Sequence, residues 1–103
     1  MLINLTSHTV NEVTTGVAIP MSGRVARAKT KTVRDNEFCG FPIFKSIVHT
    51  IEGLPEPKEG VMYIVSSLVL SACPDRKDLL APGNVLKDEN NRPVGCVGFR
   101  SNM

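Results

Sequence analysis

The chain has 103 residues, of which 42% are hydrophobic and 21% are charged, and this globular composition excludes a disordered chain. Twelve basic and ten acidic residues give a net charge of only +2. This balance excludes the strong overall field that drives nonspecific binding to long nucleic acid or to membranes. The length corresponds to one domain, residues 1–103, and the absence of tryptophan predicts a mainly aliphatic core.

The first part of the chain predicts short strands joined by turns. Residues 2–5 and 9–14 alternate apolar and polar side chains imperfectly on either side of a polar turn at 6–8. We expect these two runs to pair as an opening hairpin. A third short apolar segment, 17–19, ends at Pro20.

The next part predicts a long hairpin. Residues 24–34 carry five cations and alternate polar with small or apolar side chains, which favours an exposed strand. A loop is expected at 35–40, after which residues 41–52 return as the second strand. The candidate core residues of this second strand are Phe44, Ile47, Val48 and Ile51.

The most apolar run, residues 60–74, predicts the centre of the core. Residues 61–65 are β-branched and aromatic-rich, which suits a strand buried on both faces. Ser66 offers an oxygen to cap a helix over about 66–73, and Pro74 ends that helix. So few of the helix residues are polar that we expect burial on nearly every side.

The last part predicts a Pro82-Gly83 turn and a closing hairpin. Apolar residues 85–86 and 94–99 bracket a polar tip. The predicted fold class is therefore α+β and mainly β. We expect a small antiparallel sheet or partly open barrel of six to eight short strands with one short helix.

The sequence contains no spacing typical of a metal site, a catalytic nucleophile or a phosphate-cradling loop. Three widely spaced cysteines fit neither a zinc site nor a disulfide framework and favour a reducing cytoplasm. The apolar run is too short and too interrupted by serines to span a membrane, and the start lacks the features of an export signal. We expect no metal, no cofactor, no membrane association and no enzymatic activity.

Arginines at predicted turns are the candidate ligand-binding residues, because a guanidinium binds phosphate bidentately when the fold brings several together. The candidates are Arg24, Arg27, Arg76 and Arg92. The alternative for each is a solvated surface cation of little consequence.

Three further residues are candidates with structural alternatives. His8 lies in a turn of hydrogen-bonding residues and either caps the backbone or contacts a ligand. Tyr63 is either a core ring with a bonded hydroxyl or a stacking platform. Asp78 either forms a local salt bridge with Arg76 or binds a ligand hydroxyl.

Several motifs together resemble a family of small phage and prophage proteins that open with a Leu-Ile-Asn-Leu-Thr-Pro-His-like stretch. The matching segments are residues 2–8, with Ser7 in place of the proline, 20–24, 53–57, 63–66, 75–79, 82–83 and 95–96. The resemblance covers most of the chain. It implies a phage accessory protein that acts in the cytoplasm of an infected bacterium, where small phage proteins commonly blunt host defence.

The leading hypothesis is a non-enzymatic anti-defence protein, expected to be a homo-oligomer. It would sequester a nucleotide-like immune signal, of the cyclic oligonucleotide or cyclic ADP-ribose type, in an arginine-lined pocket. One alternative is a protein-binding inhibitor of a host defence complex such as a CRISPR effector. A second alternative is a virion or assembly component.

Overall fold

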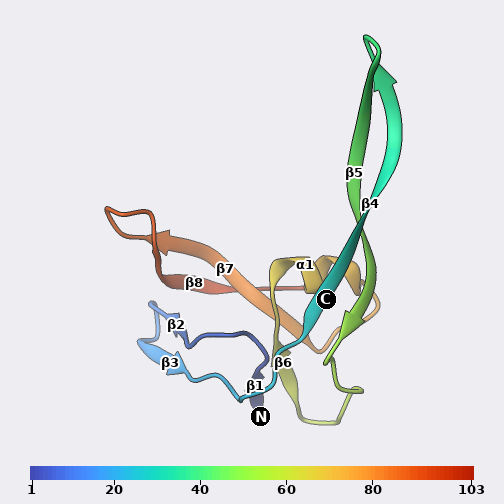
Figure 1. Cartoon of the computed structure of the whole chain (residues 1–103). Coiled ribbons are helices and arrows are strands. Elements are labelled where there is room, and N and C mark those ends of the chain that lie inside the picture. The colour runs from blue at the N-terminus through green and yellow to red at the C-terminus, as the bar shows by residue number, and fades with distance from the viewer.

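Eight strands and one short helix build the chain, and the computed structural model describes all 103 residues (Figure 1). This confirms the predicted class, which is mainly β with six to eight strands and one helix. No helix is long and apolar enough to cross a bilayer. The elements are β1 (Leu2–Asn4), β2 (Val10–Glu12), β3 (Val17–Ile19), β4 (Arg27–Phe38), β5 (Phe41–Glu52), β6 (Met62–Ile64), α1 (Ser67–Ala72), β7 (Leu79–Lys87) and β8 (Pro93–Ser101).

Six of the strands form one mixed sheet in the order β1-β6-β7-β8-β2-β3. β6 pairs in parallel with both β1 and β7. The β6–β7 pair is parallel because α1 carries the chain back across between these two strands. The β7–β8 and β2–β3 pairs are antiparallel. The sheet is nearly closed, since the Asn4 amide at the end of β1 donates to the Ile19 carbonyl at the end of β3 over 2.9 Å.

The predicted opening hairpin is wrong, because β1 and β2 do not pair with each other. β1 pairs with β6, while β2 lies between β3 and β8. The reason lies in the turn between them. Asn4 and Thr6 bind the backbone of this turn with their side chains, so it crosses the open side of the sheet instead of folding β2 back onto β1.

The central apolar run folds as predicted into β6 and α1. Ser66 has extended backbone angles, and its hydroxyl accepts from the Val69 N–H, which caps the helix. Tyr63, Val65 and Val69 lie in the main core. The predicted burial of α1 on nearly every side is wrong, because Leu68 is 49% exposed.

β4 and β5 form the predicted long hairpin, which projects from the rest of the molecule (Figure 1). We call this hairpin the arm. The expected loop at 35–40 is only a two-residue turn, because Cys39 and Gly40 both have positive φ and close the strands tightly. Of the four predicted core residues only Ile51 packs against the core, and Phe44 is 58% exposed because nothing lies over the outer arm.

β7 and β8 form the predicted closing hairpin, but the predicted Pro82-Gly83 turn is wrong. Both residues lie within β7, where Pro82 pairs with Phe99 of β8. A Cβ atom at position 83 would lie 2.5 Å from the Val97 carbonyl oxygen, so glycine there allows the two strands to approach closely.

Glu12 stabilises the junction of β2 and β8 as a buried carboxylate, 5% exposed, that has no cationic partner. It accepts from the Gly98 N–H over 2.7 Å, from the Thr14 hydroxyl, and from the backbone and hydroxyl of Thr15. The Gly98 N–H and the Thr14 hydroxyl lower the pKa of Glu12 to about 2, because they bind its ionised form.

We expect this carboxylate to make stability depend on acid pH. Since the folded pKa lies below the unfolded value of 4.5, its contribution is complete above about pH 5 and is lost as pH falls toward 2. The free energy of unfolding of the Glu12→Gln variant should therefore fall less over that pH window than that of wild type. The slope of this free energy against pH should correspond to up to about one proton fewer taken up on unfolding. Urea unfolding followed by circular dichroism at several pH values measures this, and parallel slopes would contradict it.

Candidate functional site

A cavity of about 410 Å³ lies where the loop after β1, the start of β4, the start of α1 and the middle of β7 meet. We call it the His8–Arg27 cavity. Its size is within the range of small-molecule pockets, about 300–1,000 Å³. The lining residues are Leu5, Thr6, Ser7, His8, Val25, Ala26, Arg27, Ala28, Ser66, Ser67, Leu68, Pro82 and Val85.

The lining combines hydrogen-bond donors with apolar surface and includes no carboxylate. Its only permanently charged residue is Arg27, for which no salt bridge forms. Four hydroxyl side chains and one imidazole supply further polar contacts. Such a lining suits a molecule that has an apolar or flat part and an anionic group.

The position of His8 is fixed by a network around the buried Asn4. The Asn4 amide donates to the His8 carbonyl over 2.9 Å, and its Oδ1 accepts from the Thr6 hydroxyl over 2.6 Å. Thr6 Oγ1 also lies 2.9 Å from the His8 carbonyl and 3.3 Å from His8 Nδ1. With Nδ1 facing Thr6, His8 Nε2 is available to a ligand.

A second arginine lies beside the cavity. The Arg100 guanidinium on β8 donates to the Ser67 hydroxyl at the start of α1. Because Ser67 lines the cavity, Arg100 brings a second cation close to it. Residues 25–28 form another wall of the cavity. A hydrogen bond from the Ala26 N–H to the Leu5 carbonyl, 2.9 Å long, holds this wall against the end of β1.

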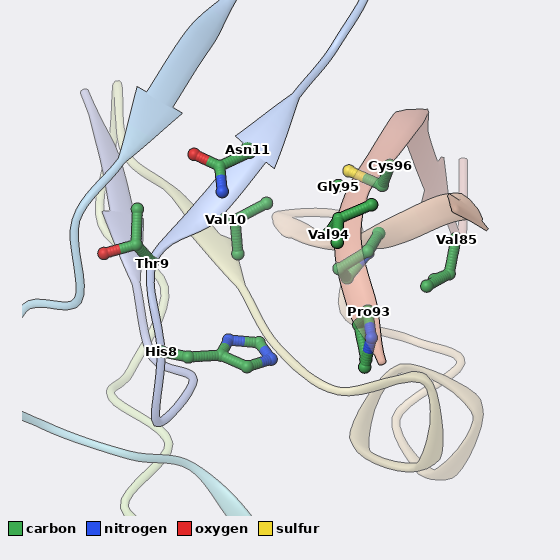
Figure 2. Close-up of a pocket in the computed structure, with 10 residues that line it drawn as sticks. His8, Thr9, Val10, Asn11, Val85, Pro93, Val94, Gly95 and Cys96 are labelled. Carbon is green, nitrogen blue, oxygen red and sulfur yellow. The ribbon is translucent and has the colours of Figure 1, made fainter. Parts of the chain in front are cut away.

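His8 also lines a smaller cavity of about 100 Å³ between β2 and β8 (Figure 2). The imidazole projects from the β1–β2 loop toward Pro93 at the start of β8. Cys96 lines the same cavity, but burial, and less strongly the Glu12 carboxylate, raise the pKa of its thiol. A buried and protonated thiol is not an activated nucleophile.

The four predicted arginines do not share one pocket, so the predicted arginine-lined pocket is not formed by them. Among them only Arg27 lines a described cavity. Arg24 is exposed in the segment between β3 and β4, and Arg92 is exposed in the β7–β8 turn, where its backbone N–H donates to Asp88. Arg24 lies in the connection before β4 and Arg92 lies in the turn before β8, so no strand brings either of them into the cavity.

Arg76 and Asp78 form a local salt bridge, which is the structural alternative for both. Two guanidinium nitrogens lie 2.9 Å from the two Asp78 oxygens, and the guanidinium also donates to the Pro55 carbonyl. Bonding to Arg76 lowers the pKa of Asp78, and bonding to Asp78 raises the pKa of Arg76. The pair thereby links the start of β7 to the connector between β5 and β6, residues 53–60.

Tyr63 belongs to the core cluster and is 4% exposed. This position matches its predicted core alternative. A ring so deeply buried has no face open for a base to stack on.

The sequence pattern does not indicate the hydroxyl residues or Arg100 as parts of this site. At Ser66 the pattern indicates a helix cap, and the capped helix start is one wall of the cavity. Ser67 and Arg100 belong to no motif, because their approach depends on how α1 and β8 pack in the fold.

No known family model, curated protein or solved structure matches the chain. The resemblance to phage proteins therefore stays a prediction. No group of three or more histidine, cysteine or acidic side chains is arranged to hold a metal ion. The function of the His8–Arg27 cavity is therefore inferred from its lining residues alone.

Proposed function

We propose that this protein binds a nucleotide-like anionic molecule in the His8–Arg27 cavity and holds it without chemical change. The observation that carries this proposal is a cavity of about 410 Å³ with His8 and Arg27 in its lining, Arg100 beside it and no carboxylate. Arg27 would bind an anionic group, and the hydroxyls and His8 Nε2 would bind polar edges. The apolar residues would contact a flat ring.

The biological setting that we propose is phage anti-defence. A small phage-encoded protein in the bacterial cytoplasm would sequester an immune signal of the cyclic oligonucleotide or cyclic ADP-ribose type. The support for this setting is the sequence resemblance, and the support for an anionic ligand is the cavity chemistry. The sequestered signal would leave the cavity chemically unaltered.

Ligand depletion followed by release tests the proposal. The protein is incubated with cyclic dinucleotides and with a cyclic ADP-ribose isomer, and the free ligand is measured before and after heat denaturation. We expect one ligand to disappear from solution and to return intact on heating. No depletion of any of these ligands would contradict binding, and return of a cleaved product would make the protein an enzyme.

The Arg27→Gln variant should bind the depleted ligand about 10- to 100-fold more weakly, because it loses a charge-assisted hydrogen bond. Isothermal titration calorimetry measures the change. The matched control is Arg92→Gln, which removes the same charge from the β7–β8 turn outside the cavity. Equal affinities of the two variants would show that Arg27 does not contact the ligand.

A further inference from the structure

The outer part of the arm lies away from every other element (Figure 1). Its base is anchored, since Ala28 and Ile51 pack against the main core. Beyond that base each strand pairs only with the other, and an isolated two-stranded hairpin is marginally stable in water. We therefore expect another surface to pack against the outer arm and stabilise it.

One face of the outer arm carries most of the apolar side chains of this part of the hairpin. Side chains alternate between faces along a strand, and directly paired residues share a face. Eight residues therefore share this face, Phe41, Ile43, Lys45 and Ile47 of β5 and their partners Phe38, Asn36, Val33 and Lys31 of β4. We call this surface the apolar arm face, after its five apolar members: Val33, Phe38, Phe41, Ile43 and Ile47.

The tip of this face is the most exposed apolar part of the arm. Phe38 and Phe41 are 70% and 69% exposed. The opposite face holds Pro42, Phe44 and Val48 among five polar residues: Thr30, Thr32, Arg34, Glu37 and Ser46. The two faces therefore differ most at the tip, where the paired rings of Phe38 and Phe41 form an exposed aromatic surface typical of a binding site.

A matching groove lies at the base of the arm. Residues 48–51 of β5 and Leu68, Ser71 and Ala72 of α1 line a hollow of about 400 Å³. The arm is an extended ribbon, so its tip cannot fold back into this groove in the same chain. The groove of a second copy is open to it.

The surface area supports a second copy as the occupant. The accessible surface of 7036 Å² exceeds by about 1,300 Å² the value of about 5,700 Å² expected for a compact monomer of 11.2 kDa. A standard interface needs only about 800 Å² from each partner. The arm also carries both signs of charge, five cations and three anions, so it does not select an oppositely charged partner.

We infer that the arm is a dimerisation device. The aromatic tip of one copy enters the groove between α1 and the base of the arm in a second copy. A two-fold axis relates the copies, so the tip of the second copy enters the same groove of the first. A two-fold arrangement closes the assembly at two chains, because each copy offers one tip and one groove. This inference does not depend on the proposed ligand.

Analytical ultracentrifugation of the full chain under reducing conditions tests the inference, since the reductant prevents disulfides through the exposed Cys39. We expect about 22 kDa, twice the chain mass of 11.2 kDa. The double substitution Phe38→Ser and Phe41→Ser should weaken the dimer about 100-fold or more, because both rings lose their apolar contact. Circular dichroism of this variant checks that it stays folded.

The matched control is Phe44→Ser, which removes a similarly exposed ring from the opposite face. It should leave the dimer intact. A monomeric wild type, a dimer that survives the double substitution, or equal weakening by Phe44→Ser would overturn the inference. A monomer that instead forms a stoichiometric complex with a bacterial protein through Phe38 and Phe41 would overturn it in favour of a protein-binding inhibitor.

Discussion

The Asn4→Ala variant is expected to lose about 3–5 kcal/mol of the free energy of unfolding, a large part of the total for a small domain. Asn4 is fully buried, and both the nitrogen and the oxygen of its side-chain amide form hydrogen bonds. Its Nδ2 donates to the carbonyls of His8 and Ile19, and its Oδ1 accepts from the backbone and hydroxyl of Thr6. Alanine would remove all four of these hydrogen bonds, and the Ile19 carbonyl and the Thr6 N–H would lose their bonds to Asn4.

Urea unfolding followed by circular dichroism measures this loss. The matched control is Asn90→Ala, which makes the same chemical change in the exposed β7–β8 turn and should cost no more than about 0.5 kcal/mol. If Asn4→Ala came within about 1 kcal/mol of wild type, the amide would not close the sheet. The variant should also bind ligand more weakly, because Asn4 positions the loop that carries His8.

The second large effect is expected at Gly53, which joins the arm to the connector before β6. Its φ is +78°, and a Cβ atom there would lie 2.3 Å from the Val25 carbonyl oxygen. Gly53→Ala combines backbone strain with a clash against backbone, so we expect a loss of about 2–4 kcal/mol. Because residues 25–28 line the His8–Arg27 cavity, displacement of Val25 should also lower ligand affinity.

A control separates the clash from the strain at this glycine. Gly60 has a similar φ of +76°, but a Cβ atom there meets nothing within 4 Å. Gly60→Ala should therefore cost only about 1 kcal/mol and leave ligand affinity unchanged. Thermal unfolding of the two variants gives the comparison, and equal losses would mean that the close approach to Val25 is not limiting.

The parts of the fold that the sequence predicted are those with a strong local signal. The apolar run at 61–65, the Ser66 cap and the tip of the closing hairpin each fix nearby backbone geometry. The pairing of β1 with β6 could not be predicted in this way, because it joins residues about 60 positions apart. The helix crossover that makes β6 and β7 parallel has the same long-range character.

The candidate site was predicted only in part for a related reason. His8 and Arg27 line the cavity, but Arg76 is held by Asp78, and Arg24 and Arg92 lie outside it. Residue type indicates that a guanidinium can bind phosphate, and that binding stays a prediction. The positions of the side chains depend on long-range pairing, including the register of β4 with β5 and of β7 with β8. Arg100 reaches Ser67 only through the second of these registers.

An amide chemical-shift titration shows whether a cyclic nucleotide binds in the His8–Arg27 cavity. Isotope-labelled protein is titrated with the cyclic nucleotide that it depletes from solution, and the shifts are assigned along the chain. We expect the largest changes in three cavity segments, residues 6–8, 25–28 and 66–68, with little change at the arm tip. If the largest changes lay only in other segments, or if no amide shifted at ligand concentrations that the protein depletes, the ligand would not bind in this cavity.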